Sequence, residues 1–106
     1  MASPTSRSLE LLRAEGWLCG IVEQTIRAPG IIFKRDLFTI GDIIAIREGE
    51  TMLVQTTSGL NNLSKRLQKI ADCEHLPTIR RAGWRIEAHG WRKLKGRWEV
   101  KREDLS

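Results

Sequence analysis

The chain has 106 residues, 41% of them hydrophobic, and its 18 Lys and Arg against 13 Asp and Glu give a net charge of +5. This length predicts one domain with a single core. No apolar run approaches the roughly 18 residues that cross a bilayer, and the first residues lack an apolar signal-peptide core, which argues against a membrane or secreted protein.

Cysteine usage and charge distribution narrow the class further. Cys19 and Cys73 lie far apart and outside any Cys-x-x-Cys pair, which argues against a disulfide framework or zinc site and predicts a cytoplasmic, intracellular protein. Residues 1–60 carry 6 Lys and Arg against 7 Asp and Glu (6 − 7 = −1), whereas residues 61–106 carry 12 against 6 (12 − 6 = +6). The second half is therefore the candidate surface for a polyanion, although a merely soluble basic protein has the same balance.

The N-terminal part is predicted to contain a helix and a strand. The helix runs from about Ser6 to Glu15, with leucines on one face and Gly16 at its end. Trp17 to Gln24 has the apolar density of a first strand, and the following Pro29-Gly30 marks a turn. Glu23 is the acid within this strand.

Two strands joined by a tight turn are predicted within residues 35–59. The run from Phe38 to Ile46 is almost entirely apolar and rich in isoleucine, which is typical of a short strand buried on both faces. Arg47 to Glu50 supplies a polar turn with a glycine, and Met52 to Val54 resumes the apolar run. Strands this close in sequence are expected to pair antiparallel.

Three oxygen-bearing side chains are expected to converge on this hairpin. Asp42 is the one charge inside the first strand. Side chains alternate along a strand, so Gln55 and Thr57 share one face of the second strand while Thr56 points to the other. If the register brings Asp42 beside that face, the three side chains meet.

The second half is predicted to contain two helices and two strands. They are a helix through about Ala71 after the cap candidates Asn61 and Asn62, a short helix from Leu76 or Pro77 to Ala82, a strand from Trp84 to Trp91 and a last strand beginning at Trp98. In the first helix, Lys65, Arg66 and Lys69 lie away from the apolar face. Residues 1–6 and 102–106 are expected to be flexible.

A strongly basic turn is predicted between the last two strands. It contains four cations, Arg92, Lys93, Lys95 and Arg97, and Trp91 directly precedes them. Cations neutralise phosphates and a tryptophan can stack on bases, although strand tryptophans are usually buried in the core. His89 could be a general acid or base, but a single histidine without an identified partner is more often structural.

Two segments and the order of the elements resemble a known superfamily. Gly41-Asp42-Ile43-Ile44-Ala45 and Val54-Gln55-Thr56-Thr57-Ser58 resemble the Pro-Asp segment and the Glu-x-Lys strand of PD-(D/E)xK nucleases, most closely the Holliday-junction-resolvase-like branch, which includes phage and prophage proteins. The resemblance covers about Leu9 to Trp91. It implies an α/β (α+β) fold with a restriction-endonuclease-like three-layer core, in which helices flank a mixed central sheet.

The resemblance also implies an activity and roles for individual residues. The protein would be a metal-dependent DNA endonuclease or resolvase-like phosphodiester hydrolase, bacterial or phage-encoded and homodimeric, acting on structured or double-stranded DNA with Mg²⁺ or Mn²⁺. Asp42 would be the principal metal ligand, Gln55 would replace the second carboxylate, and the carbonyl of Thr56 would complete the protein ligands. Thr57 stands where the family's lysine orients or activates the attacking water.

The departures from the family pattern point to replacements. The Gln and Thr remove a negative charge from the metal site and a cation from beside the nucleophile, so Lys65 or Lys69 on the following helix is the natural substitute lysine. Thr5 stands near the place of the family's helix acid, which leaves Glu23 and Asp36 as replacement acids. The alternative for Asp36 is a turn carboxylate paired with a neighbouring Lys34 or Arg35.

The expected nucleic-acid contacts come from the helix and the basic turn. They are Arg35, Lys65, Arg66, Lys69, Trp91, Arg92, Lys93, Lys95 and Arg97. Two readings compete with the nuclease: a catalytically impaired nuclease-fold module that only binds nucleic acid, and a subunit whose basic surface binds an acidic protein.

Overall fold

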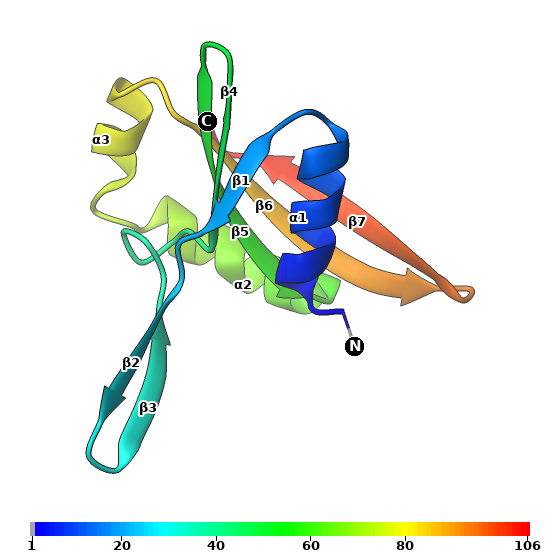
Figure 1. The fold of residues 1–106 in the computed structure, drawn as a ribbon, viewed down its shortest axis with the longest axis horizontal. Coiled ribbons are helices and arrows are strands. Elements are labelled where there is room, and N and C mark those ends of the chain that lie inside the picture. Colours follow the sequence, from blue (N-terminus) through cyan, green and yellow to red (C-terminus); the bar gives the residue numbers. More distant parts are fainter. Residues whose placement is uncertain (1) are drawn as a thin grey trace.

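A computed structural model describes residues 2–106 as an α+β fold (Figure 1). Its elements are α1 (Pro4–Ala14), β1 (Leu18–Ile21), β2 (Gln24–Ala28), β3 (Ile31–Arg35), β4 (Ile43–Arg47), β5 (Glu50–Ser58), α2 (Leu60–Ala71), α3 (Leu76–Arg81), β6 (Arg85–Leu94) and β7 (Arg97–Asp104). None of the described helices is long and apolar enough to cross a membrane.

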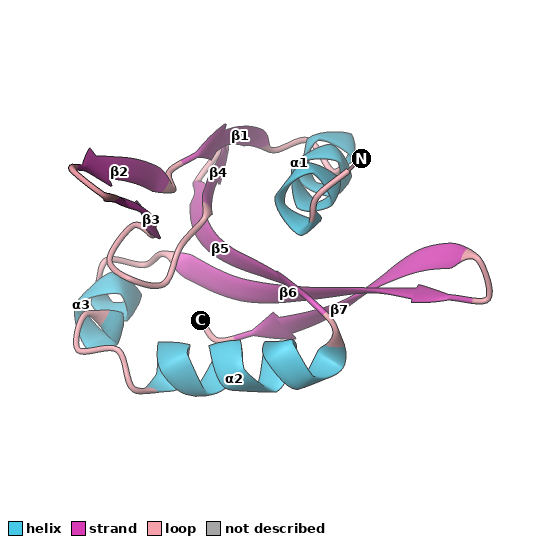
Figure 2. Ribbon diagram, turned by 90° about the horizontal axis from the view of Figure 1, so that it is seen from below, coloured by secondary structure: helices cyan, strands magenta, loops and turns pink. Residues whose placement is uncertain are grey.

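Five strands form a mixed sheet in the order β1-β4-β5-β6-β7, in which only β5 and β6 run parallel. Helix α1 covers one face of this sheet, and α2 with α3 covers the other (Figure 2). The predicted mixed sheet flanked by helices is therefore confirmed. The parallel pair requires a long connection, and α2 and α3 supply it.

The core is divided between the two faces of the sheet. Met52 and Val54 pack towards α1, whereas Leu53 packs towards α2 and α3. All three side chains are buried. Their alternation explains why β5 appears in the sequence as an uninterrupted apolar run, because each face of a central strand meets a helix.

Helix α1 begins earlier than predicted. Pro4 occupies its first turn, and the hydroxyl of Ser3 accepts a hydrogen bond from the Ser6 amide at 3.1 Å. Serine is a favourable N-cap and proline fits the first helical turn, which explains the earlier start. The flexibility expected for residues 1–6 stays a prediction. Met1 lies outside the described residues.

The strand predicted from residue 38 begins only at Ile43. Before it, Phe38 and Thr39 have φ angles of 53° and 67°, and a tight turn joins Leu37 to Gly41 through reciprocal backbone hydrogen bonds of 2.8 and 3.0 Å. Ile40 is nevertheless buried in the core. A buried turn and a buried strand give the same apolar run, so periodicity could not separate them.

Gly41 is required by close packing. A Cβ atom at this position would lie 2.2 Å from Cδ1 and 2.5 Å from Cγ of Leu53. Leu53 is 1% exposed and packs within the buried core. Gly41→Ala is therefore expected to destabilise the protein by about 3 kcal/mol in urea denaturation.

Gly20→Ala is the matched control for this prediction. A Cβ atom there meets only Cγ2 of Ile44 at 3.9 Å, an ordinary contact. It is expected to change the stability by less than about 0.5 kcal/mol. Equal stability of the two variants would contradict the packing explanation.

Strands β2 and β3 form a separate two-stranded sheet that the sequence pattern did not predict. The expected strand over residues 17–24 ends at Ile21, and the chain then leaves the main sheet. The hairpin projects away from the body of the protein (Figure 1). Its turn contains Gly30 with φ 74°, which confirms the predicted Pro-Gly turn.

The C-terminal hairpin is longer than predicted. Its strands continue to Leu94 and start again at Arg97, so the basic turn lies at the tip of a long β6–β7 hairpin. The tail is anchored, because Ser106 Oγ accepts a hydrogen bond from the Ile86 amide at 2.9 Å and the Leu105 amide donates to the Ile86 carbonyl at 2.8 Å. The flexibility expected for residues 102–106 stays a prediction.

Candidate metal centre

Three carboxylates converge beside the main sheet. Glu23 lies between β1 and β2, Asp36 follows β3, and Asp42 precedes β4. One oxygen of each lies within 4.8 Å of an oxygen of the others, and we call these three residues the acidic cluster. The β2–β3 hairpin folds back on itself, and this brings Glu23 and Asp36 together. The acidic cluster could hold a metal ion.

Asp42 is held in place by β5. Its Oδ2 accepts hydrogen bonds from Gln55 Nε2 at 2.8 Å, the Thr56 amide at 2.8 Å and Thr56 Oγ1 at 3.1 Å. The predicted meeting of Asp42 with Gln55 is thus present. The side chain of Thr56 also reaches Asp42, contrary to the expectation that it points away, because Asp42 lies at the end of the ladder rather than within it.

The pKa of Asp42 is raised to about 7. Burial is the main cause, and the hydrogen bond and negative charge of Asp36 add to it, whereas the Thr56 amide lowers the pKa. Below about pH 7 Asp42 therefore retains a proton, because burial and the neighbouring Asp36 both disfavour its ionised form. A divalent cation can replace that proton and stabilise the fully ionised pair.

The amide of Gln55 leaves one acceptor free. Its Nε2 faces two acceptors, Asp42 Oδ2 and the Thr56 carbonyl at 3.4 Å, which orients Oε1 to the other side. Gln55 is 2% exposed, and Oε1 has no hydrogen-bond partner among residues 2–106. A buried acceptor without a partner costs about 1–3 kcal/mol. Rotation of the amide would turn Oε1 towards Asp42, where a hard cation would satisfy it, so the residues present fit a Mg²⁺ or Mn²⁺ ion.

Cations surround the acidic cluster. Lys34 Nζ lies 3.2 Å from Glu23 Oε1, and Lys69 Nζ lies 3.7 Å from Asp36 Oδ2. Of the two lysines proposed from α2, the structure brings only Lys69 to the cluster, since Lys65 is exposed and does not line the cavity. Lys34 was not predicted as a site residue, because the closure of the β2–β3 hairpin places it there.

The acidic cluster opens into a polar cavity of about 630 Å³. Thr57 lines it, as do Arg66 and the first turn of α1. Thr5 Oγ1 lies 3.0 Å from Thr56 Oγ1, which links α1 to the strand that holds Asp42. The Thr5 hydroxyl therefore contacts the site indirectly, through Thr56.

The other expected nucleic-acid contacts are divided between surface and core. The exposed ones are Arg35 on β3 and Arg92, Lys93, Lys95 and Arg97 on the β6–β7 hairpin. Trp91 is only 8% exposed, and its Nε1 donates to Ser8 Oγ at 2.8 Å, so its expected stacking on bases is corrected to a role in packing. Trp98 on the same hairpin is 43% exposed, with the Arg7 guanidinium 3.9 Å from its ring centroid.

His89 belongs to a buried network and does not face the cavity. It is fully buried, with Nδ1 2.8 Å from Ser8 Oγ and Nε2 3.0 Å from Glu87 Oε1. The Trp91 indole donates to Ser8 Oγ, so the serine hydroxyl can direct its proton to Nδ1. Nε2 then carries the ring proton and donates to Glu87. The structural reading of His89 therefore fits better than general acid–base catalysis.

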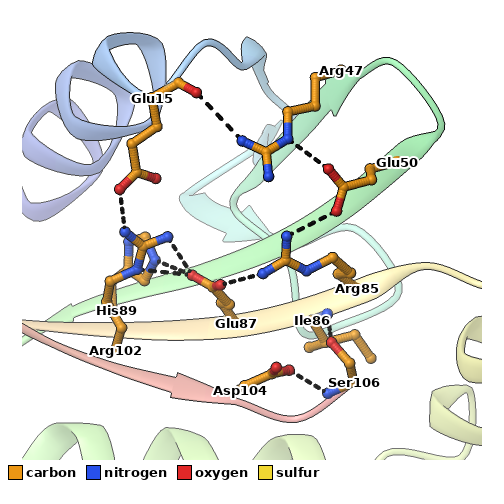
Figure 3. A network of polar contacts seen from close by, with 10 residues as sticks. All are labelled: Glu15, Arg47, Glu50, Arg85, Ile86, Glu87, His89, Arg102, Asp104 and Ser106. Atoms are coloured by element: carbon orange, nitrogen blue, oxygen red, sulfur yellow. Dashed lines mark hydrogen bonds and ion pairs between the residues drawn. The ribbon is translucent and has the colours of Figure 1, made fainter.

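Glu87 is the centre of this network (Figure 3). It accepts hydrogen bonds from two nitrogens of Arg102 at 2.9 and 3.0 Å and from Arg85 at 3.2 Å. Burial alone would raise its pKa, but the hydrogen bonds of His89 and Arg102 and the positive charge of Arg102 lower the pKa to about 2. Arg102 also pairs with Glu15 at 2.6 Å, which connects the end of α1 to the sheet.

No protein-family model matches this chain, and no curated protein matches it in sequence. The assignment of function therefore rests on the site itself.

Proposed function

We propose that the protein is a metal-dependent DNA endonuclease with a restriction-endonuclease-like core, acting on structured or double-stranded DNA. The observation that supports this best is the acidic cluster beside the partnerless amide oxygen of Gln55, in a cavity edged by Lys34, Arg66 and Lys69. Oxygen ligands for a divalent cation next to cations for phosphate are the components that phosphodiester hydrolysis needs.

Asp42, Asp36, Glu23 and Gln55 would hold the Mg²⁺ or Mn²⁺ ion. The two additional acids compensate for the negative charge that is lost where the family has a carboxylate in place of Gln55. A bound divalent cation lowers the pKa of a water molecule and offsets developing phosphoryl charge.

The remaining cavity residues bind and orient the substrate in this proposal. Lys69 takes the place of the family's lysine, since its ammonium already lies at the cluster. Arg66 supplies a second cation on the same helix for a DNA phosphate. The Thr57 hydroxyl orients the attacking water, and a homodimer would present two such sites for cleavage of both strands.

Cleavage of linear duplex and four-way-junction DNA tests the proposal. We expect nicked or cut product with Mg²⁺ or Mn²⁺ and none with EDTA. Salt-sensitive DNA binding without any metal binding in calorimetry would overturn it in favour of the binding module. That alternative is supported by the Gln55–Asp42 hydrogen bond, which satisfies Asp42 Oδ2 without a metal.

Metal affinity is expected to depend on pH. Asp42 must lose the proton held at its raised pKa of about 7 before it can bind a cation. Mn²⁺ affinity should therefore fall about tenfold per pH unit below pH 7 and level off above it. Calorimetry across this range would measure it, and an affinity that does not change through pH 7 would contradict the role of Asp42.

A further inference from the structure

The β2–β3 hairpin, residues 24–35, is an arm that projects away from the body of the protein (Figure 1). It forms its own two-stranded sheet, and every residue of β3 is exposed. The arm contains Arg27, Lys34 and Arg35 and no acid. Arg27 and Arg35 have no ion-pair partner within residues 2–106, so the arm is a cationic extension.

The outer part of the arm is apolar. Ile31, Ile32 and Phe33 are 57%, 69% and 44% exposed, directly after the turn. By register, Phe33 pairs with Ile26 on one face, whereas Ile32 pairs with Arg27 on the other. Large apolar side chains gathered on a projecting element are typical of a binding surface.

The two ends of the arm lie at the acidic cluster. Glu23 immediately precedes β2 and Asp36 immediately follows β3. Lys34 on the arm forms the 3.2 Å ion pair with Glu23. A ligand bound to the arm therefore lies next to the acidic cluster and can move two of the three carboxylates of the cluster.

We infer that the arm binds in a groove of duplex DNA beside the bond to be cut, an inference that rests on the proposed function. A two-stranded ribbon fits the major groove, and apolar side chains can wedge against a base step. Arg27 and Arg35 neutralise phosphates, while Ile31 and Ile32, on opposite faces of the arm next to its turn, contact the two walls of the groove. Two like-charged arms would repel each other, so the charge favours DNA over a second copy of the chain.

Binding of the arm to DNA is expected to change the affinity of the metal centre for its ion. Because the arm ends at Glu23 and Asp36, DNA binding fixes the positions of both carboxylates. Coupling of this kind is reciprocal, so duplex DNA raises the affinity for metal and metal raises the affinity for duplex DNA by the same factor.

The double variant Ile31→Ser/Ile32→Ser tests the arm. Binding of a fluorescent duplex, measured by anisotropy in EDTA, is expected to weaken at least about tenfold, because both apolar wedge contacts are lost. Leu18→Ser is the matched control: Leu18 is 73% exposed on β1, outside the arm, and duplex binding should not change. Mn²⁺ affinity without DNA should be unchanged in both variants.

The outcomes separate this inference from the proposed function. Wild-type duplex affinity in the double variant would overturn the arm's role. The arm's role would also be overturned if sedimentation showed a dimer for the wild type and a monomer for the double variant. The apolar surface would then contact a second copy of the chain. Weakened binding by a protein that cleaves no DNA would support the arm while overturning the proposed nuclease.

Discussion

Asp42→Asn is expected to lower Mn²⁺ affinity by at least about 100-fold and to abolish DNA cleavage. Loss of a residue that only supports a ligand already costs about 10–100-fold in metal affinity, and Asp42 is a carboxylate that contacts both Gln55 and Asp36. The asparagine has the shape of the protonated carboxyl group and can keep an oxygen for the Thr56 amide. Calorimetry with Mn²⁺ and the cleavage assay measure the two effects.

The same variant is expected to stabilise the metal-free protein. The raised pKa of Asp42 means that the folded state holds a proton more tightly than the unfolded state, so stability falls as the pH rises from about 4 to about 7. The rise of the Asp42 pKa from 3.8 to about 7 corresponds to about 4 kcal/mol of stability as an upper value. Above pH 7, Asp42→Asn should therefore unfold at higher urea concentration than the wild type, because it keeps part of the stability that the wild type loses on ionisation.

Glu48→Gln is the matched control for Asp42→Asn. It makes the same change of charge at an exposed residue in the β4–β5 turn. It should leave metal affinity, cleavage and stability near wild type. Unchanged Mn²⁺ affinity in Asp42→Asn would contradict the metal centre, even if cleavage were lost.

Glu87→Gln is expected to destabilise the protein by about 3 kcal/mol at neutral pH. The substitution removes the carboxylate that His89, Arg85 and Arg102 share, and hydrogen bonds to charged groups are each worth about 1.5–3 kcal/mol. Because the pKa of Glu87 is lowered from 4.5 to about 2, its ionised form stabilises the folded state at pH values above 4.5. This stability is lost as the pH falls from 4.5 towards 2.

The difference between Glu87→Gln and wild type should therefore shrink in acid. Urea denaturation near pH 7 and near pH 3 measures this. Glu99→Gln changes an exposed carboxylate on β7, and its stability should be close to that of the wild type at both pH values. A pH-independent difference between Glu87→Gln and wild type would show that packing, rather than the ionised carboxylate, accounts for the loss.

The β4–β5 hairpin and the meeting of Asp42 with Gln55 could be predicted from the sequence. Both depend on local signals: a glycine-containing polar turn, two apolar runs and the two-residue period of a strand. Residues opposite each other near a tight turn have little freedom in register. The observed pairing of Ile43 with Val54 places Asp42 beside Gln55 as this reasoning requires.

The rest of the site depends on packing between distant segments. Glu23 and Asp36 were candidate acids, but only the closed β2–β3 hairpin shows that they meet and that Lys34 joins them. The burial of Trp91 depends on Ser8, which lies 83 positions away in the chain. Periodicity does not encode such contacts, so the sequence left both the stacking and the core interpretation of Trp91 open.

Anomalous diffraction from a crystal soaked in Mn²⁺ tests the central claim most directly. A single manganese peak is predicted between the carboxylates of Asp42 and Asp36, with Gln55 Oε1 turned to the ion. Absence of a peak, with the ammonium groups of Lys34 and Lys69 remaining on the carboxylates, would contradict the metal centre.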